Sequence, residues 1–444
     1  MASLVISSCQ NKIEQEIVVI GGGLMGSATA WELSKHGQNV LLIEQQDSIY
    51  TYGSSFGEAR ISRSLGPKND IFSYLQQTSV AETQKLISYL NEVEKSKVHS
   101  MEDIYASSPV TYIYGKSQQH DVNLLLDGQM DQYEYAPSSE KALEMFDMVV
   151  PDSLMVIREY KEFSGTLNPK VLISKLHQGI EYSGSKIFFN EKVTTLQRKN
   201  GHYEIEITNT KTGENKVVLS KKIVSAAGPY TGILVKDIAP YINQLITPQR
   251  LFLAFFKMDK NTFESFSYEQ KKRLHEFYPI IDESDPDMFY SMIEQYDEDG
   301  APILKIGGHF LRTDVKNLDE VWQKELTQNE IEWSKNNTLT YFNMLNLSID
   351  ATALKFYKGY SCVYSLTETG IPYVTNAVND KNEIDPYFVI VGGMSGIGAK
   401  GSLAYGLIAA HLLLNKTDTS KIYLRTRTAL GFDRLLEDKV RVDN

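Results

Sequence analysis

The chain has 444 residues, of which 42% are hydrophobic and 23% are charged, a composition typical of a globular protein with two or three domains' worth of core. A formal net charge of -11 excludes the broad basic surface that nucleic-acid binding requires, so we expect no nucleic-acid partner. Cys9 and Cys362 lie far apart and indicate no disulfide framework, and no apolar run is long enough to span a bilayer.

The first residues admit two interpretations. Residues 4–8, ahead of Cys9, resemble the end of a bacterial lipoprotein signal, but they lack a basic segment and their apolar core is short. We therefore expect a soluble protein, cytoplasmic by default. The alternative is a bacterial lipoprotein that is anchored through Cys9.

A strand, a glycine-rich turn and a helix are predicted next. Apolar residues 17–20 precede the turn, a helical pattern runs from 24 to about 36, and a second apolar strand, 40–43, ends in Glu44. The turn contains three glycines at G-x-G-x-x-G spacing, Gly21, Gly23 and Gly26. In such a βαβ unit the glycines admit a pyrophosphate at the helix N-terminus, and the acidic residue is placed to bind ribose hydroxyls. The motif predicts a dinucleotide site and leaves FAD and NAD open.

A polar loop with two arginines follows. In βαβ folds the loop at residues 52–63 runs beside the cofactor, where it would reach both dinucleotide and substrate. If a helix begins at Glu58, Arg60 and Arg63 share one side of it. The alternative is a solvated basic face.

The middle of the chain alternates between helical and strand patterns. Helices are expected over 71–98, 163–179, 268–276 and 330–347. Strands are expected within 105–150 with a hairpin at 126–129, as a meander over 186–227, and at 248–258, 288–293 and 303–309. The meander ends in small residues and Gly228, where a flat ring or a ribose can approach the backbone.

The last part of the chain contains a second strand, glycine loop and helix. A buried strand at 387–391 precedes a loop with Gly393, Gly396 and Gly398, and a helix follows at 403–414. A dinucleotide site that is closed by a distant second glycine loop is typical of flavoproteins. The cofactor prediction therefore moves from NAD toward FAD.

These motifs, in this order, resemble those of the FAD-dependent amine oxidases that include monomeric sarcosine oxidase and N-methyltryptophan oxidase. The resemblance covers residues 17 to about 430. The loop at 53–63 is similar to the family's G-S-x-x-G-x-x-R-x-x-R. It implies that Ser54 and Arg60 lie by the flavin and that Arg63 binds the substrate carboxylate.

Two further segments carry the resemblance. L-K-I-G-G-H at 304–309 resembles L-K-x-G-x-H, which implies that Lys305 faces the flavin and promotes its reaction with oxygen, with His309 nearby. Such a cation would stabilise the charge that develops on oxygen. The alternatives are a lysine whose ammonium reaches solvent and a structural histidine. The segment around Cys362 implies a covalent bond to the flavin, for which a nearby cation should lower the thiol pKa; the alternative is a small buried hydrophobe.

The second glycine loop completes the implied substrate site. Residues 393–400 are similar to G-F-S-G-H-G-F-K, which implies that Lys400 joins Arg63 in binding the carboxylate. Two cations suit a carboxylate, because arginine can bind it bidentately. Tyr290 stands where the family has an active-site tyrosine. No metal site is expected.

The resemblance implies an α/β protein, α+β overall, with a Rossmann-type FAD-binding domain and a second, β-sheet-rich substrate domain. We expect residues 1–98, 160–245 and 355–444 in the first domain and residues 99–159 and 246–354 in the second. We also expect a monomer.

The implied activity is oxidation of a carboxylate-bearing secondary amine, such as sarcosine or an N-methyl amino acid. Hydride passes to FAD, the imine hydrolyses, and O2 is reduced to H2O2. One alternative is a dehydrogenase that uses another electron acceptor. The other is a noncatalytic, membrane-tethered flavoprotein. This alternative stays open because the chain departs from the family motifs at Ser55, Phe56, Met394, Ile397 and Ala399.

Overall fold

A computed structural model describes residues 12–66, 69–127, 132–379 and 381–443. The lipidation considered at Cys9 lies outside the described residues, as do Gly128 and Gln129 of the expected hairpin. Among the described helices, none combines the length and the apolar character needed to cross a bilayer. No group of side chains suited to a metal ion occurs within the same described ranges.

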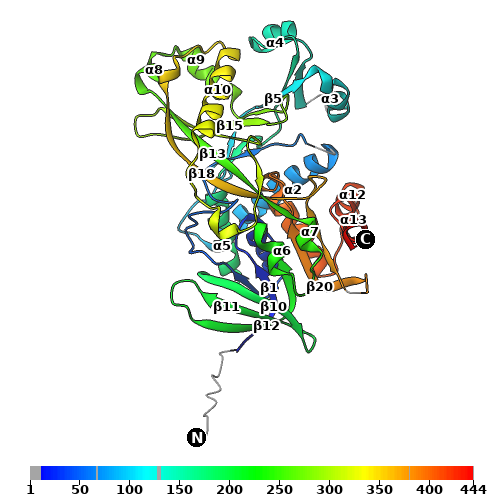
Figure 1. The fold of residues 1–444 in the computed structure, drawn as a ribbon. Helices are drawn as coiled ribbons and strands as arrows, with labels where there is room; N and C mark the ends of the chain where they lie inside the picture. The colour runs from blue at the N-terminus through cyan, green and yellow to red at the C-terminus, as the bar shows by residue number, and fades with distance from the viewer. Residues whose placement is uncertain (1–11, 67–68, 128–131, 380, 444) are drawn as a thin grey trace.

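Two large sheets organise the described part of the chain, one at each end of the molecule in Figure 1. The first sheet has eight described strands and a parallel centre. Its parallel strands, in spatial order, are β9 (Lys186–Phe188), β2 (Val40–Ile43), β1 (Lys12–Ile20), β12 (Asn215–Ser225) and β20 (Ile384–Gly392). Its antiparallel strands are β10 (Glu191–Lys199), β11 (His202–Asn209) and β19 (Tyr373–Val378).

The predicted βαβ unit is confirmed as β1, α1 (Leu24–Lys35) and β2. Ile17 and Val19 belong to one hydrophobic cluster, while Val18 and Ile20 belong to another on the opposite face. An apolar run without alternation is what a strand covered on both faces requires. The predicted meander is confirmed for β10–β12, whereas Lys186–Phe188 joins β2 in parallel instead.

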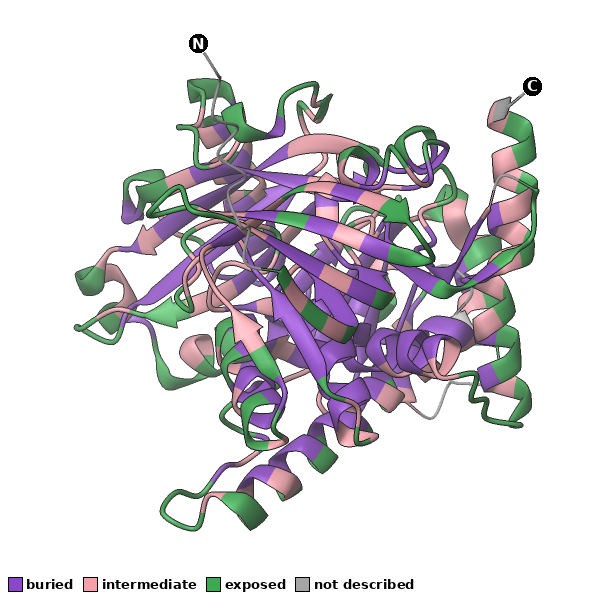
Figure 2. Cartoon of the chain, turned by 90° about the horizontal axis from the view of Figure 1, so that it is seen from below, coloured by how far each residue is buried: buried purple, intermediate pink, exposed green. Residues whose placement is uncertain are grey.

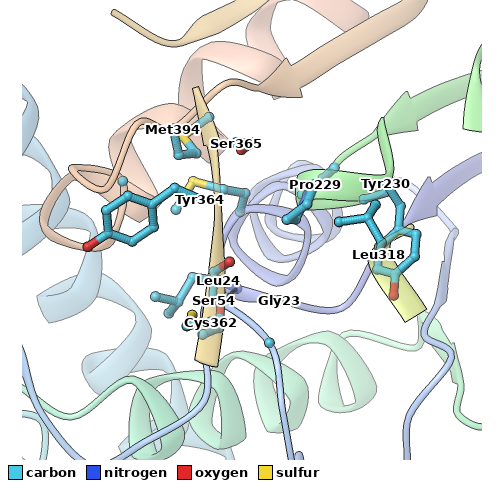
Figure 3. Close-up of a pocket in the computed structure, with 18 of the residues that line it drawn as sticks. Gly23, Leu24, Ser54, Pro229, Tyr230, Leu318, Cys362, Tyr364, Ser365 and Met394 are labelled. Atoms are coloured by element: carbon cyan, nitrogen blue, oxygen red, sulfur yellow. Dashed lines mark hydrogen bonds between the residues drawn. The ribbon is translucent and has the colours of Figure 1, made fainter. Parts of the chain in front are cut away.

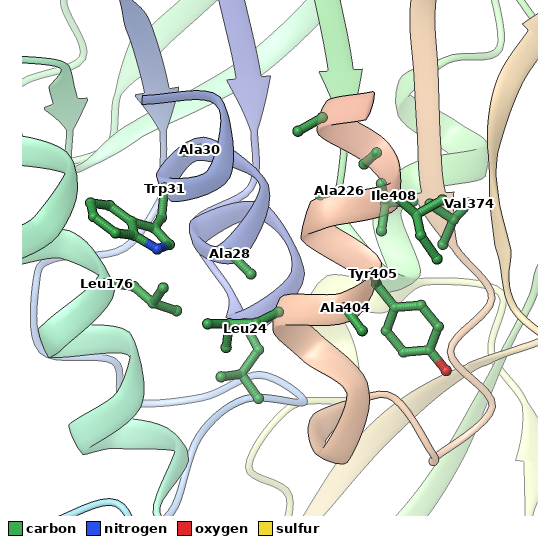
Figure 4. Packing of buried hydrophobic residues seen from close by; sticks show 14 of the residues in the cluster. Leu24, Ala28, Ala30, Trp31, Leu176, Ala226, Val374, Ala404, Tyr405 and Ile408 are labelled. Atoms are coloured by element: carbon green, nitrogen blue, oxygen red, sulfur yellow. The ribbon is translucent and has the colours of Figure 1, made fainter. Parts of the chain in front are cut away.

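Helices α1, α2 (Asn69–Val93), α5 (Pro169–Tyr182) and α11 (Ser402–Leu413) pack together on one face of this sheet. Figure 4 shows Trp31 between α1 and α5, and Ala28 of α1 facing α11. The two helices approach closely because α11 carries Gly406. A Cβ at that position would lie 2.6 Å from the carbonyl carbon of Ala28.

The second sheet has nine described strands and is mostly antiparallel. Its order is β17 (Thr313–Asp314), β13 (Thr247–Met258), β16 (Pro302–Gly308), β15 (Phe289–Tyr296), β14 (Ile280–Asp282), β5 (Val110–Gly115), β7 (Leu154–Glu159) and β6 (Tyr133–Ala136), with β18 (Leu354–Leu366) along β13. Three helices accompany it, α8 (Lys260–Ser265), α9 (Tyr268–Phe277) and α10 (Gln328–Met344). Figure 2 shows strands that are largely buried and loops that are largely exposed.

A small third sheet joins β3 (Arg60–Ser62), β8 (Gly165–Leu167) and β4 (Tyr105–Ser107). The helix expected from Glu58 is therefore wrong. Residues 60–62 form a strand because β8 supplies an edge that pairs with them, Ile61 opposite Thr166. In an extended segment, residues three apart point to opposite sides, so Arg60 and Arg63 do not share a face.

Two short helices were missed inside 105–150. They are α3 (Gln119–Leu126) and α4 (Ser139–Phe146), each of which buries apolar residues four positions apart, as helices do. Leu126 thus ends a helix and does not enter a hairpin.

The remaining described elements connect or cap the sheets. The other α-helices are α6 (Thr231–Leu234), α7 (Ile242–Leu245), α12 (Lys421–Ala429) and α13 (Phe432–Asp443). Short 3-10 turns occur at Lys116–Gln118, Gly228–Tyr230, Leu318–Glu320, Ala351–Ala353 and Ala399–Gly401. The division into two domains stays a proposal. The first domain was expected to resume at residue 355, but β18, which begins at Leu354, pairs with β13 of the second sheet.

We predict that Gly406→Ala destabilises the protein even though alanine is intrinsically the better helix former by roughly 1 kcal/mol. The added methyl group meets the backbone of α1, which cannot move without separating the two helices. The free energy of unfolding in urea should fall by about 1–3 kcal/mol. Gly115→Ala, whose Cβ would meet no atom closer than 3.5 Å, is the matched control. An equally or more stable Gly406→Ala protein would contradict this packing.

Candidate active site

A cavity of about 790 Å³ lies between the two large sheets. Its walls come from segments that are far apart in the sequence, at 20–25, 43–63, 191–196, 226–237, 281–292, 305–322, 362–370 and 394–400. In Figure 3, Tyr364 and Met394 lie on one side and Pro229, Tyr230 and Leu318 on the other, with Gly23 between them.

The first glycine loop closes tightly against the end of β12. Gly21 has a φ of +99°, and a Cβ there would lie 2.5 Å from the carbonyl oxygen of Ala226. A Cβ at Gly26 would lie 1.7 Å from the carbonyl oxygen of Gly21. Gly21 and Gly23 line the cavity at the N-terminus of α1, while Gly26 lies behind them. This arrangement suits an anionic group such as a pyrophosphate.

Glu44 fixes the shape of this loop. One oxygen of its carboxylate accepts a hydrogen bond from the backbone N–H of Gly22 at 2.6 Å, and the other accepts one from Gln46 at 2.8 Å. Burial raises the pKa of Glu44. The carboxylate also lines the cavity, where it would reach hydroxyl groups of a bound nucleotide.

The loop at 53–60 is fastened to several parts of the chain. The Ser54 hydroxyl donates to the carbonyl of Val363 in β18 at 2.7 Å, and the Ser55 hydroxyl accepts from the backbone N–H of Leu24 at 3.1 Å. The Arg60 guanidinium donates to the carbonyls of Ser54, at 3.0 Å, and Phe56. The loop therefore has a defined shape beside the cavity.

Lys305 lies in β16, and its side chain is 1% exposed. Its Nζ donates to the carbonyl of Ala59 at 2.8 Å and to the carboxylate of Glu294 at 3.0 Å. Burial, and then the neighbouring Arg60, lower the pKa of Lys305 to about 8, although Glu294 opposes this. Burial alone would raise the pKa of Glu294, but Lys305 and backbone N–H groups hold it below its usual value. No motif in the sequence indicates this pairing.

Arg63 and Lys400 both line the cavity and are close enough for their charges to interact. Arg63 is 12% exposed, donates to the carbonyl of Leu65 at 3.0 Å and lies 3.9 Å from the carboxylate of Glu283. Lys400 is 4% exposed, and its Nζ has no hydrogen-bond partner among the described residues. Burial, and then Arg63, lower the pKa of Lys400 well below its ordinary value. A buried donor without a partner beside a guanidinium is suited to an anionic ligand.

Cys362 lines the cavity from β18, and its side chain is buried. The expectation that a nearby cation lowers its pKa is wrong in its net direction. Arg60 and Lys305 do favour the thiolate, but burial outweighs them and raises the pKa of the thiol. Sequence spacing identifies the cations and cannot measure the cost of burial.

Two more predicted residues, Tyr290 and His309, line the cavity, and so does Tyr364. The hydroxyl groups of Tyr290 and Tyr364 are 3.2 Å apart, and burial raises the pKa of both. Burial and Arg312 lower the pKa of His309 to about 4, so its imidazole is neutral at neutral pH.

Most of the predicted site residues therefore border one cavity. Those that line it are Gly21, Gly23, Glu44, Ser54, Arg60, Arg63, Gly228, Tyr290, Lys305, His309, Cys362, Gly396, Gly398 and Lys400. Gly26 and Gly393 lie off it. Gly393 instead occupies a left-handed turn with a φ of +68°, packed against Thr367. Glu294 and Glu283 were missed, because an isolated acidic residue carries no motif.

Comparisons with known proteins give matches over most of the chain. Residues 16–412 match the model of the family described as FAD dependent oxidoreductase. A probable sarcosine oxidase of Arabidopsis thaliana is 25% identical over 259 residues, which cover 57% of this chain and 58% of that protein. An N-methyl-L-tryptophan oxidase of Yersinia pestis is 22% identical over 404 residues, which cover 90% of this chain and 94% of that protein.

Solved structures share the fold. NikD, an unusual amino acid oxidase, matches with a TM-score of 0.67 at 16% identity and covers 94% of this chain and 97% of its own. L-proline dehydrogenase from P. horikoshii matches with a TM-score of 0.69 at 15% identity, over 96% and 99%. The predicted α/β fold, with one parallel-rich and one mostly antiparallel sheet, is confirmed.

We predict that Lys305→Met lowers the free energy of unfolding by about 3–5 kcal/mol, because it leaves the buried Glu294 carboxylate without its cation. Lys305→Met combined with Glu294→Gln should cost clearly less, since no uncompensated charge remains. Urea unfolding of both variants measures this. Equal costs for the single and the double variant would show that the two side chains do not interact.

Proposed function

Since the chain belongs to the FAD dependent oxidoreductase family, we propose that it oxidises a secondary amine that carries a carboxylate. The observation that carries this proposal is the buried pair of Arg63 and Lys400, with the Lys400 Nζ unpartnered, in the cavity that the glycine loop borders. The names of the relatives specify sarcosine and N-methyl-L-tryptophan, which are both N-methyl amino acids.

The residues present fit FAD. Gly21 and Gly23, at the N-terminus of α1, would receive the pyrophosphate, and Glu44 would bind ribose hydroxyls. Gly228, at the end of β12, leaves the backbone open to the ligand, since no atom lies within 4 Å of where its Cβ would be. FAD supplies the two-electron redox chemistry for which no side chain is suited.

The Arg63 and Lys400 pair would orient the substrate. The guanidinium can give two parallel hydrogen bonds to a carboxylate, and Lys400 can add a third. A carboxylate beside Lys400 favours its protonated state and so offsets the effect of burial and of Arg63. With its carboxylate fixed, the amine-bearing carbon is held in one position, which lowers the entropic barrier to reaction.

A covalent bond between Cys362 and FAD is a second part of the proposal. The thiol borders the cavity, and the charges of Arg60 and Lys305 favour the thiolate that attachment requires. Burial opposes that ionisation, so we expect attachment to be slow and to be complete in the mature holoenzyme.

A dehydrogenase that passes electrons to an acceptor other than O2 is the second candidate function. The observation that favours it is the ion pair between Lys305 and Glu294, because a carboxylate 3.0 Å from the ammonium cancels part of its field. Such an enzyme would use the same carboxylate site but form little H2O2 in air.

We predict that an N-methyl, cyclic or glycated amino acid bleaches the oxidised flavin of the holoenzyme without oxygen. Arg63→Ala should raise the half-saturating concentration by roughly 10- to 100-fold, the effect of losing one charged hydrogen-bonded contact. Lys170→Ala, an exposed lysine outside the cavity, is the control. A holoenzyme that no such amine bleaches would instead fit the noncatalytic alternative.

The same titration has a predicted pH dependence. The pKa of Lys400 is lowered in the free protein, and an anionic ligand binds its protonated form better. Affinity should therefore fall as pH rises through the pKa of free Lys400, and Lys400→Met should remove that dependence. A pH dependence that is identical in the Lys400→Met protein would exclude Lys400 from the carboxylate site.

The covalent bond is tested by acid precipitation of the holoenzyme. Yellow colour should remain with the precipitate of the wild-type protein and pass into the supernatant for Cys362→Ala. Colour that is entirely in the wild-type supernatant would exclude the bond.

A further inference from the structure

We propose that Glu294 is a positioning residue that sets the charge of Lys305 and, through it, the rate at which the reduced enzyme passes electrons to O2. The inference rests on the proposed function, in which Lys305 faces the cofactor. Glu294 lies outside the family motifs that this chain resembles, and its charge bears on whether the protein acts as an oxidase or as a dehydrogenase.

The contacts of Glu294 hold the ammonium in one place. The Glu294 side chain is 6% exposed, and its carboxylate lies 3.0 Å from Nζ of Lys305. It also accepts hydrogen bonds from the backbone N–H groups of Glu58 at 2.8 Å and Ala59 at 3.1 Å. The carbonyl of Ala59 in turn accepts from Nζ at 2.8 Å. Two of the three N–H groups of the ammonium thus donate to Glu294 and to the carbonyl of Ala59, in the segment that Glu294 also binds.

The backbone of β15 is irregular at this residue. Ile293 pairs with Leu304, and Gln295 pairs with Ile303, so Glu294 is the extra residue of a β-bulge. Bulges redirect side chains and are common beside active sites. Here the bulge frees Glu294 from the ladder with β16 and lets its carboxylate reach the loop that carries Ala59.

Lys305 has contrasting neighbours on the surrounding strands. Glu294 of β15 favours its charged state, as a thiolate at Cys362 of β18 would, whereas burial and Arg60 of β3 oppose it. The ring of Phe255, in β13, lies 5.8 Å from Nζ. Removal of the Glu294 charge therefore leaves burial and Arg60 less opposed, and the ammonium should lose its proton at lower pH.

Glu294 has two opposite effects on oxygen chemistry. Reduction of O2 to H2O2 takes two electrons, which come from the amine, and two protons; negative charge develops on oxygen with the first electron. A cation stabilises that charge, and an anion beside the cation offsets it. Glu294 thus maintains the cation near neutral pH while it weakens the field of that cation. Without Glu294, transfer to O2 should be faster at low pH and slower at high pH.

Rapid mixing of anaerobically reduced holoenzyme with O2 tests this across a pH series. In the wild-type protein the rate constant should fall with a midpoint near pH 8, where Lys305 loses its proton. In Glu294→Gln, whose amide keeps one of the two acceptor oxygens and removes the negative charge, the midpoint should move down by about one pH unit or more. The two profiles should cross, and a merely structural role would not produce a crossing.

Glu58→Gln is the matched control. The backbone N–H of Glu58 donates to Glu294, but the Glu58 side chain is 36% exposed and its carboxylate pairs with the exposed Lys170. Its pH profile should coincide with that of the wild-type protein. A shift in Glu58→Gln equal to that in Glu294→Gln would overturn the inference, because any nearby negative charge would then serve.

A second measurement does not depend on activity. Carbon-13 NMR of holoenzyme labelled at the lysine Cε atoms follows the protonation of Lys305, whose resonance is the one lost in the Lys305→Met, Glu294→Gln double variant. The titration midpoint should be near 8 in the wild-type protein and lower in Glu294→Gln. An unchanged midpoint overturns the inference. A shifted midpoint with unchanged rates toward O2 supports the control of charge by Glu294 and overturns the role of Lys305 in the proposed function.

Discussion

The loop between residues 53 and 63 is the constraint on which the site depends, because helix α1 and two of the three sheets hold it in place. Ser55 is bonded to the N-terminus of α1, Ser54 to β18, and Ala59 to Lys305 of β16. The last residues of the loop form β3 in the small third sheet. If any of these attachments were lost, the arginines of the loop would no longer be fixed relative to the glycine turn and the second sheet.

The site also concentrates buried charge that would be costly in an ordinary core. The protein handles the two cationic groups differently. Lys305 forms an ion pair with Glu294, whereas Lys400 has no hydrogen-bond partner among the described residues. A stabilising core would have paired both, so the unpaired Lys400 marks where a ligand is expected to supply the counter-charge. At Lys305 the counter-charge comes from the protein's own Glu294 and not from a ligand.

The sequence predicted those parts of the fold whose signals are local. The βαβ unit could be located because its glycines and its apolar strands follow one another directly, and α5 because Asn168 and Pro169 form a helix start. Strand β3 could not be predicted, since three residues become a strand only where β8, about a hundred positions later, offers its edge. Helices α3 and α4 are too short for their periodicity to stand out among neighbouring strands.

The candidate site also has a part that the sequence predicts and a part that it does not. Most of the residues that motif spacing identified border the cavity, although they lie in segments far apart in the chain. Glu294 had no such signal, because its role arises from a bulge and from contact with a loop more than two hundred positions away. The raised pKa of the Cys362 thiol was missed because it is the difference between a burial cost and an attraction to cations, and only packing decides which is larger.

A crystal structure of the holoenzyme with a carboxylate-bearing amine analogue that cannot be oxidised is the most direct test of the proposed carboxylate site. FAD should occupy the cavity between the two large sheets, and the ligand carboxylate should lie within hydrogen-bond distance of both Arg63 and Lys400. A ligand carboxylate bound elsewhere, with Lys400 still unpartnered, would exclude these two residues as the carboxylate site.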